Sequence, residues 1–310
     1  MPRSHRSTEL GAFLRKRRAE RSPTDVGLPG SGTGESRRVP GLRRQEVAEL
    51  ASISTDYYTR IEQGRMPASL PVLGNLTRAL RLSRDEWSYM LKLAVEQPCD
   101  DAWARNEPSS VDATVQRILD DLGRTPAFVI GPHTEVLAWN RLAARIFLDF
   151  GQIPLEQRLF VRLLFTDPRL RSLYDDWEEV AHLAIDQLRM HTAHDPDNPG
   201  LLALVAELSA LSPQFDAWWD QRQVNIRTTG TKLLHHPTAG DLDLDWSTLT
   251  CAASPDQQMV VWTGEPGSAT YRALQSLAWC AAGTAHQDSP GLESNSLIPA
   301  RSGSSRSGDH

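Results

Sequence analysis

Features common in secreted, membrane-bound and disulfide-bonded proteins are scarce in this chain of 310 residues. Its three cysteines, Cys99, Cys251 and Cys280, are far apart and form no Cys-x-x-Cys pair. This pattern disfavours a disulfide framework or a structural zinc site and is typical of a reducing cytoplasm. No run of about 18 apolar residues occurs, so the sequence predicts no membrane span. Residues 1–13 hold no apolar stretch of the signal-peptide kind, so we expect a cytoplasmic protein.

Catalytic signatures are also missing. The sequence contains neither a Gly-x-Ser-x-Gly motif nor a Cys-His signature of nucleophilic enzymes. His191 and His194 are three residues apart near a helix end, but no third metal ligand accompanies them. We therefore expect no catalytic residues, no metal and no cofactor. An enzyme fused to a DNA-binding module is the least favoured hypothesis.

Charge is unevenly distributed along the chain, although the net charge is only −6. Residues 1–95 carry 17 Lys and Arg against 10 Asp and Glu, a balance of +7. The remainder carries 16 against 29, a balance of −13. Because a basic module attracts the phosphate backbone, this asymmetry favours an N-terminal nucleic-acid binder joined to a second domain.

Apolar residues at helical spacing predict five short helices within the first 95 residues. They cover 7–21, 42–51, 55–63, a segment from Pro71 and a segment after Ser83. A Gly-, Ser- and Pro-rich loop over 22–40 follows the first helix. Ser54 is placed to cap the third helix, and Gly64 to end it. The fifth helix is expected to turn one apolar face inward, made of Trp87, Met90, Leu91 and Ala94.

The second and third helices, joined by the turn 52–54, carry the strongest functional pattern. Two short helices joined in this way place the second across the first, with its N-terminal side chains in the major groove of DNA. Tyr58 and Ile61 point inward, so the opposite face of the third helix can meet base edges. Arg60 can bind guanine through two hydrogen bonds. We expect DNA contacts from Arg43, Arg44, Thr55, Asp56, Tyr57, Thr59, Arg60 and Arg65.

Residues 41–65 read Gly-Leu-Arg-Arg-Gln-Glu-Val-Ala-Glu-Leu-Ala, then Ser-Ile-Ser, then Thr-Asp-Tyr-Tyr-Thr-Arg-Ile-Glu-Gln-Gly-Arg. This pattern resembles the Cro/repressor-type helix-turn-helix of the XRE family, and the resemblance covers residues 8–95. It implies an all-α, lambda-repressor-like, five-helix DNA-binding domain, with an ion pair between Glu62 and Arg18. The family's turn usually opens with Gly; Ser52 stands there instead and strains a position of positive φ. A helical bundle that binds protein is the alternative.

After a predicted linker over 96–110, the pattern changes to that of an α/β domain over 111–281 with an antiparallel sheet. We expect strands over 127–130, 136–139, 232–235, 242–246 and 259–263, and helices over 111–122, 141–150, 176–192, 200–211 and 213–222. Residues 241–246 alternate Asp with Leu or Trp, which is typical of a strand with one wet face. Residues 283–310 are rich in Ser and Gly and predict a disordered tail.

Motifs spread over 113–280 resemble the ligand-binding domain of MmyB-like transcription regulators. They are Thr125–Val129, Val136–Asn140, Leu163–Phe165, Tyr174–Glu178, Ser209–Phe215, Gly230–Lys232, His236–Pro237, Gly240–Leu244 and Thr263–Ser268. The resemblance implies a PAS-like fold with an apolar pocket, suited to a fatty-acyl-like or other hydrophobic small molecule. Large aromatic residues can line such a pocket or fill the core. The pocket candidates are Phe128, Trp139, Phe165, Trp177 and Trp262.

Together these patterns predict a sequence-specific DNA-binding transcription regulator, controlled by a small hydrophobic ligand in the C-terminal domain. We expect a homodimer on double-stranded DNA, because operators of such motifs have two-fold symmetry. The alternative is a regulator whose C-terminal domain binds no ligand and only mediates dimer or partner contacts.

Overall fold

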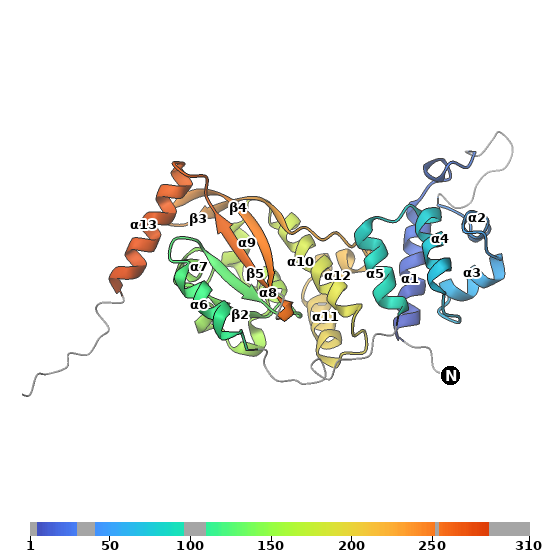
Figure 1. The fold of residues 1–310 in the computed structure, drawn as a ribbon, viewed down its shortest axis with the longest axis horizontal. Coiled ribbons are helices and arrows are strands. Elements are labelled where there is room, and N and C mark those ends of the chain that lie inside the picture. Colours follow the sequence, from blue (N-terminus) through green and yellow to red (C-terminus); the bar gives the residue numbers. More distant parts are fainter. Residues whose placement is uncertain (1–4, 30–40, 96–109, 252–253, 285–310) are drawn as a thin grey trace, which may run out of the picture.

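The computed structural model describes residues 5–29, 41–95, 110–251 and 254–284 (Figure 1). Residues 30–40 of the predicted loop, 96–109 of the predicted linker and 285–310 of the predicted tail lie outside the described residues. Within the described ranges, no helix is both long and apolar enough to cross a membrane.

The described part of the N-terminal domain is all helical, which confirms the predicted fold class. Its elements are α1 (His5–Glu20), a short 3-10 turn (Thr24–Val26), α2 (Arg44–Leu50), α3 (Thr55–Glu62), α4 (Leu70–Leu80) and α5 (Arg84–Ala94). Helix α1 packs against α3 and α5, and α2 packs against α3 and α4. The shared core includes the fully buried side chains of Phe13, Leu14, Leu42, Val47, Tyr58, Ile61, Leu73 and Leu76.

The turn between α2 and α3 has the local structure that its residues predict. The Ser54 hydroxyl accepts a hydrogen bond from the Tyr57 N–H at 3.2 Å, which caps α3. Gly64 follows α3 with a φ of 65°, and Ser52 has a φ of 57°. The left-handed conformation costs a side-chain-bearing residue about 1–2 kcal/mol. The predicted strain at Ser52 is therefore confirmed.

Helix α5 buries a different face from the one that its apolar residues predict. Tyr89, Met90 and Leu93 are buried, whereas Trp87 and Leu91 are half-buried. The rotation has a polar cause, because the Tyr89 hydroxyl donates to Glu9 at 3.1 Å. Apolar spacing alone gives no weight to a tyrosine that is buried through a hydrogen bond.

The C-terminal domain is an antiparallel sheet surrounded by helices. Its strands are β1 (Ala127–Ile130), β2 (Val136–Trp139), β3 (Thr229–His236), β4 (Gly240–Cys251) and β5 (Ser254–Thr263), in the order β2-β1-β5-β4-β3. Its helices are α6 (Ala113–Asp121), α7 (Arg141–Ile146), α8 (Phe160–Thr166), α9 (Pro168–Leu173), α10 (Trp177–Thr192), α11 (Pro199–Leu211), α12 (Pro213–Asp220) and α13 (Ala269–Thr284). Helices α8, α9 and α13 were not predicted.

The two faces of the sheet carry different side chains because successive residues of a strand point to opposite sides. Val129 and Met259 are neighbours on one face, where Leu119 of α6 packs against them. Phe128 and Val260 are neighbours on the other face and belong to the main core of the domain. The second face therefore looks towards a layer of helices that includes α10.

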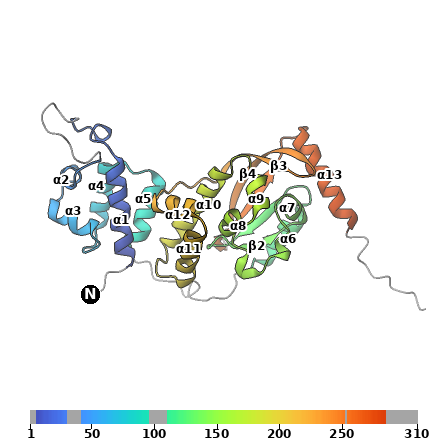
Figure 2. The ribbon, with the colours of Figure 1, turned by 180° about the vertical axis from the view of Figure 1, so that it is seen from behind.

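The two domains lie end to end, and α3 is at the outer end of the N-terminal domain, away from the sheet (Figures 1 and 2). Helices α1 and α5 lie beside α10 and α12. Met190 of α10, Ala193 at its C-cap and Val224 belong to the same hydrophobic cluster as the N-terminal core. The domains are thus joined by packed apolar side chains.

Candidate functional site

The outward face of α3 is accessible. Thr55, Asp56 and Arg60 are exposed, and Tyr57 and Thr59 are half-buried. This exposure follows from the helical period, since Tyr58 and Ile61 fill the core on the opposite side. The second domain does not cover α3 in either view of the described residues (Figures 1 and 2).

Contacts within α3 hold its polar side chains in place. Arg60 pairs with Asp56 at 2.9 Å, one helical turn earlier, and both side chains are more than half exposed. The Thr59 hydroxyl donates to the Thr55 carbonyl at 2.7 Å, and the Tyr57 hydroxyl donates to the Pro67 carbonyl at 3.2 Å. An exposed ion pair contributes little stability. Arg60 can therefore exchange Asp56 for another acceptor at low cost.

A buried carboxylate fixes α3 against α1 and α2. The Glu62 side chain is fully buried and accepts hydrogen bonds from Arg18, at 2.9 and 3.1 Å, and from Arg44, at 3.0 and 3.1 Å. Burial alone would raise the pKa of Glu62, but the hydrogen bonds and charges of Arg18 and Arg44 outweigh it and lower that pKa. The predicted ion pair between Arg18 and Glu62 is confirmed.

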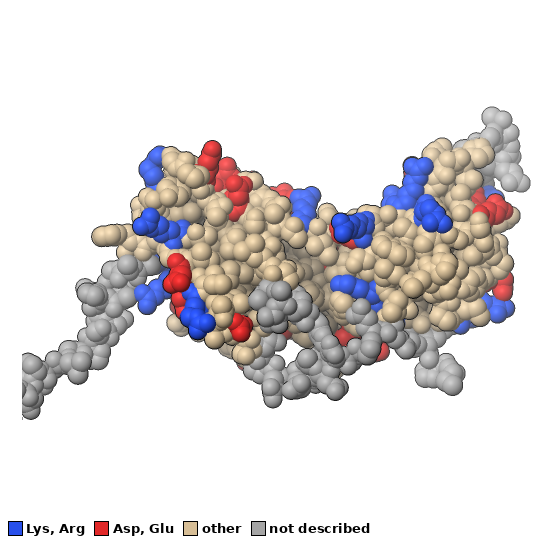
Figure 3. All heavy atoms as spheres, in the orientation of Figure 1, with Lys and Arg blue, Asp and Glu red and all other residues tan. Residues whose placement is uncertain are grey.

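The remaining predicted DNA contacts lie at the two ends of the helix-turn-helix. Arg43 is the N-cap of α2, where Glu46 accepts from its backbone N–H at 2.6 Å, and its side chain is exposed. Arg65 follows α3 and is also exposed. Arg44 is partly occupied by Glu62, although its side chain is 42% exposed. Lys and Arg side chains are visible over the N-terminal domain, at the right of Figure 3.

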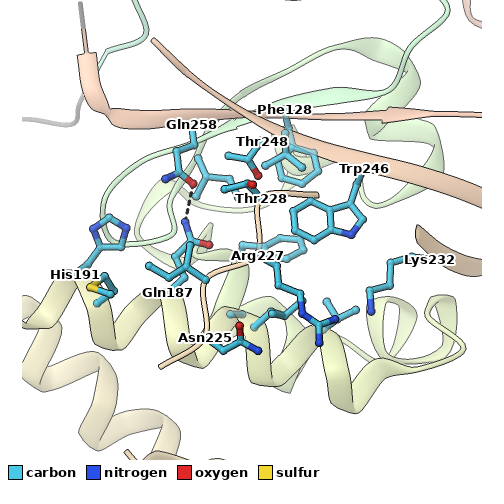
Figure 4. Close-up of a pocket in the computed structure, with 18 of the residues that line it drawn as sticks. Phe128, Gln187, His191, Asn225, Arg227, Thr228, Lys232, Trp246, Thr248 and Gln258 are labelled. Carbon is cyan, nitrogen blue, oxygen red and sulfur yellow. Dashed lines mark hydrogen bonds between the residues drawn. The ribbon is translucent and has the colours of Figure 1, made fainter. Parts of the chain in front are cut away.

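A cavity of about 270 Å³ lies between the sheet and α10 (Figure 4). Its lining residues are Lys92, Phe128, Ile130, Phe160, Tyr174, Val180, Leu183, Ala184, Gln187, Met190, His191, His194, Asn225, Ile226, Arg227, Thr228, Lys232, Trp246, Thr248, Gln258, Val260 and Trp262. The volume is near the lower end of the range of small-molecule pockets, roughly 300–1,000 Å³. The cavity is thus large enough for a small ligand.

One face of the sheet forms an apolar wall of the cavity. Phe128 pairs with Val260 across β1 and β5, and Trp246 pairs with Trp262 across β4 and β5. All four side chains point to the same side because the pairing keeps their pleats in register. Together they give a hydrophobic ligand a largely aromatic wall, in which the rings of Trp246 and Trp262 are tilted by 40°.

The charged side chains that line the cavity are all cations. They are Lys92, Arg227 and Lys232, and the lining residues include no Asp or Glu. Glu179 lies next to the cavity and pairs with both Arg227 and Lys232. One carboxylate for two cations leaves this end of the cavity positive. In Figure 4 Arg227, Lys232 and Trp246 lie at one end, and His191 lies at the other.

Several polar atoms of the lining have no hydrogen-bond partner in the described part of the chain. They are the Tyr174 hydroxyl and the indole N–H groups of Trp246 and Trp262, together with Nδ1 of His191. Burial, with the positive charge of Lys92, lowers the pKa of His191 to about 3, so its imidazole is neutral. A buried donor without a partner costs about 1–3 kcal/mol. The hydroxyl and indole N–H groups are therefore suited to donating hydrogen bonds to acceptor atoms of a ligand.

The five aromatic residues proposed for the pocket are not all in one place. Phe128 and Trp262 line the cavity. Phe165 and Trp177 lie outside it and pack edge to face, at 5.4 Å between ring centroids, in the core beneath α12. Trp139 also lies outside, stacked under the Arg158 guanidinium at 4.7 Å.

Sequence reasoning missed the polar lining of the cavity. Gln187 donates to Gln258 at 3.1 Å across the space between α10 and β5. Lys232 is only 8% exposed and lines the cavity. Its position in the strand alone did not tell whether its side chain faces solvent or the cavity. A lysine within an alternating strand was the available indication. Lys92 comes from the N-terminal domain, and no pattern in its own helix could place it here.

In the described ranges, no three His, Cys, Asp or Glu residues are grouped so that they could hold a metal ion.

Comparison with protein families gives two matches. Residues 111–277 match the MmyB-like transcription regulator ligand binding domain, and residues 9–88 match a helix-turn-helix domain. A search of curated proteins found no match.

Proposed function

We propose that this chain, which belongs to the family of MmyB-like transcription regulators, reads operator DNA as a homodimer under the control of a hydrophobic carboxylate. DNA binding and the presence of a ligand-binding domain follow from the two family matches. The base contacts, the dimer and the ligand are the proposal. The observation that carries it is α3, whose outward side chains lie at the free end of the molecule.

In this proposal the outward face of α3, from Thr55 to Arg60, enters the major groove. Arg60 leaves Asp56 and binds guanine through its two parallel N–H groups. Arg43, at the exposed start of α2, contacts a phosphate and fixes the register. Glu62 holds both helices in place, because its arginine partners come from α1 and α2.

A dimer is proposed because one helix-turn-helix covers only one half-site. Two copies bind half-sites about 34–36 Å apart, one turn of DNA, in an operator with two-fold symmetry. Selection of bound fragments from random DNA is expected to yield such a palindrome, and sedimentation of the complex is expected to give two chains per operator. A non-palindromic site bound by one chain would contradict the dimer.

The ligand is inferred from the chemistry of the cavity. The wall formed by Phe128, Val260 and Trp262 suits an apolar body. The cations Arg227 and Lys232 suit an anionic oxygen. The unpartnered N–H and O–H donors suit its acceptor atoms. An apolar molecule that ends in a carboxylate combines these properties.

The DNA proposal is tested with Arg60→Ala on the selected operator. We expect a loss of about 1–3 kcal/mol, roughly 5- to 150-fold in affinity, with relaxed preference at one base pair. Arg43→Ala is expected to weaken all sequences alike and to lower the salt slope by about 1. Arg84→Ala, an exposed residue at the start of α5 and away from α3, is the control and should change neither. Unchanged affinity and preference in Arg60→Ala would contradict the assignment of α3.

The ligand proposal is tested with decanoate and methyl decanoate on the full chain. Decanoate is expected to bind about 10- to 100-fold more tightly, because a charged hydrogen-bond partner contributes about 1.5–3 kcal/mol. Trp246→Phe keeps an aromatic ring in the wall but removes the indole N–H donor. It should therefore reduce the ratio between the affinities for decanoate and methyl decanoate. If neither compound binds, the alternative of a domain that only mediates contacts is favoured.

A further inference from the structure

The segment 221–228, between α12 and β3, is attached to the N-terminal domain along one side. The Arg17 guanidinium of α1 donates to the carbonyls of Gln221 and Arg222, at 2.8 and 3.2 Å. Val224 is 6% exposed and packs in the N-terminal core. The backbone N–H of Ile226 donates to Asp85 of α5 at 3.0 Å.

The same segment forms part of the cavity wall on its other side. Asn225, Ile226, Arg227 and Thr228 all line the cavity, and Figure 4 shows Asn225, Arg227 and Thr228 between α10 and the sheet. Ile226 therefore lines the cavity and is also bonded to α5 through its backbone N–H. A displacement of this wall by a ligand would act directly on α5.

Two further residues close the cavity from the side of the N-terminal domain. Lys92 of α5 lines it, although α5 packs in the N-terminal domain and begins within the helix-turn-helix match at 9–88. Met190 of α10 lines the cavity and also packs in the N-terminal core. The ligand-binding match at 111–277 therefore does not supply the whole site.

Buried charges make the contact between the domains specific. Glu9 of α1 lies 3.3 Å from Arg189 of α10 and 3.3 Å from Arg222. Arg189 is 1% exposed and lies over the Trp219 ring at 4.0 Å. Arg222 has a φ of 50°, a strained conformation that persists only where surrounding contacts impose it. The segment is thus held in one arrangement by both domains.

We infer that a ligand in this cavity contacts both domains, so that ligand binding and docking of the DNA-binding domain stabilise each other through segment 221–228 and Lys92. This inference rests on the proposed function in one respect, namely that the cavity holds a small molecule. By linkage, ligand and DNA must change each other's affinity by the same factor, typically about 5- to 150-fold.

The test is hydrogen exchange of the full chain with and without decanoate. We expect decanoate to slow exchange in residues 84–94 of α5 as well as in 221–228, and to change the affinity for the selected operator at least about fivefold. Asp85→Ala removes the acceptor for Ile226, and Lys92→Met removes a cation from the wall. Each should reduce the fivefold effect on DNA affinity to about twofold or less. Arg84→Ala, an exposed residue next to the half-buried Asp85, is the matched control and should retain the full effect on DNA affinity.

The outcomes separate the inference from the proposed function. If decanoate binds but slows exchange only within 111–277, and DNA affinity stays the same, the coupling is refuted while the ligand pocket stands. If Asp85→Ala and Lys92→Met retain the full effect on DNA affinity, the shared wall is refuted. If decanoate does not bind, the proposed ligand is wrong, and the coupling is overturned with it.

Discussion

Replacing Asp186 with Asn is expected to stabilise the folded protein at neutral pH. Asp186 lies on α10 and is only 5% exposed. Burial raises the pKa of its carboxyl group from 3.8 to about 6, although the charges of Arg189 and Arg17 and the Asn225 N–H lower it. Asp85, across the contact between the domains, adds a like charge. At neutral pH the folded protein thus carries a carboxylate whose charge is less favourable in this buried site than in water.

The magnitude follows from the shift of roughly two pKa units, which corresponds to about 3 kcal/mol at about 1.36 kcal/mol per unit. Because the folded-state pKa is raised, the contribution of Asp186 to the free energy of unfolding is largest below about pH 4. It falls as the pH rises through the interval from about 4 to 6, and it is lowest above that interval. Asp186→Asn keeps an acceptor for the Asn225 N–H and carries no charge. The free energy of unfolding of Asp186→Asn should therefore exceed that of the wild type by up to about 3 kcal/mol at neutral pH, and by almost nothing near pH 4.

The assay is urea unfolding, followed by tryptophan fluorescence at several pH values between about 4 and 8. Asp197→Asn is the control, because Asp197 is exposed and just beyond the end of α10. Its effect should stay within about 0.5 kcal/mol at every pH. A gain for Asp186→Asn below about 0.5 kcal/mol at neutral pH, or one independent of pH, would refute the role assigned to burial.

Two further predictions concern positions of the N-terminal domain that favour glycine, namely Ser52 and Gly11. Ser52→Gly is expected to raise the free energy of unfolding by up to about 1 kcal/mol in urea titrations, because Ser52 has a φ of 57°. Gly11→Ala should lower it by about 1–3 kcal/mol or more, because the added Cβ would lie 2.3 Å from the Glu62 carbonyl oxygen. Gly74→Ala in α4 is the matched control, since nothing lies within 4 Å of its Cβ; it should gain about 0.5–1 kcal/mol. Equal effects at positions 11 and 74 would contradict the close approach of α1 and α3.

The helix-turn-helix could be predicted from the sequence because its determinants are local. Ser54 caps α3 and Gly64 ends it, ten residues apart in the sequence, and Tyr58 and Ile61 set its inward face. Some helices of fewer than two turns gave no such pattern. Helix α8 is an example, because it has only seven residues and its buried Phe160, Val161, Leu163 and Leu164 do not repeat along a longer face.

The cavity could be predicted only in part because its walls come from distant segments. Phe128 and Trp177 are both large, aromatic and buried, yet only Phe128 lines the cavity. The difference depends on which helix covers each ring, and that depends on long-range packing. Lys92 illustrates the limit most clearly, since it reaches the cavity from the other domain.

The contact between the two domains also bears on how a ligand could control operator binding. The contact between the domains buries Met190, Ala193 and Val224 together with Glu9 and Arg189, so it fixes the direction in which α3 points relative to the sheet. In a dimer joined through the C-terminal domains, the separation of the two α3 helices would depend on that direction. Half-sites one turn of DNA apart tolerate only small changes in this separation. A small rotation at segment 221–228 would therefore be sufficient to separate a DNA-binding dimer from one that cannot reach both half-sites.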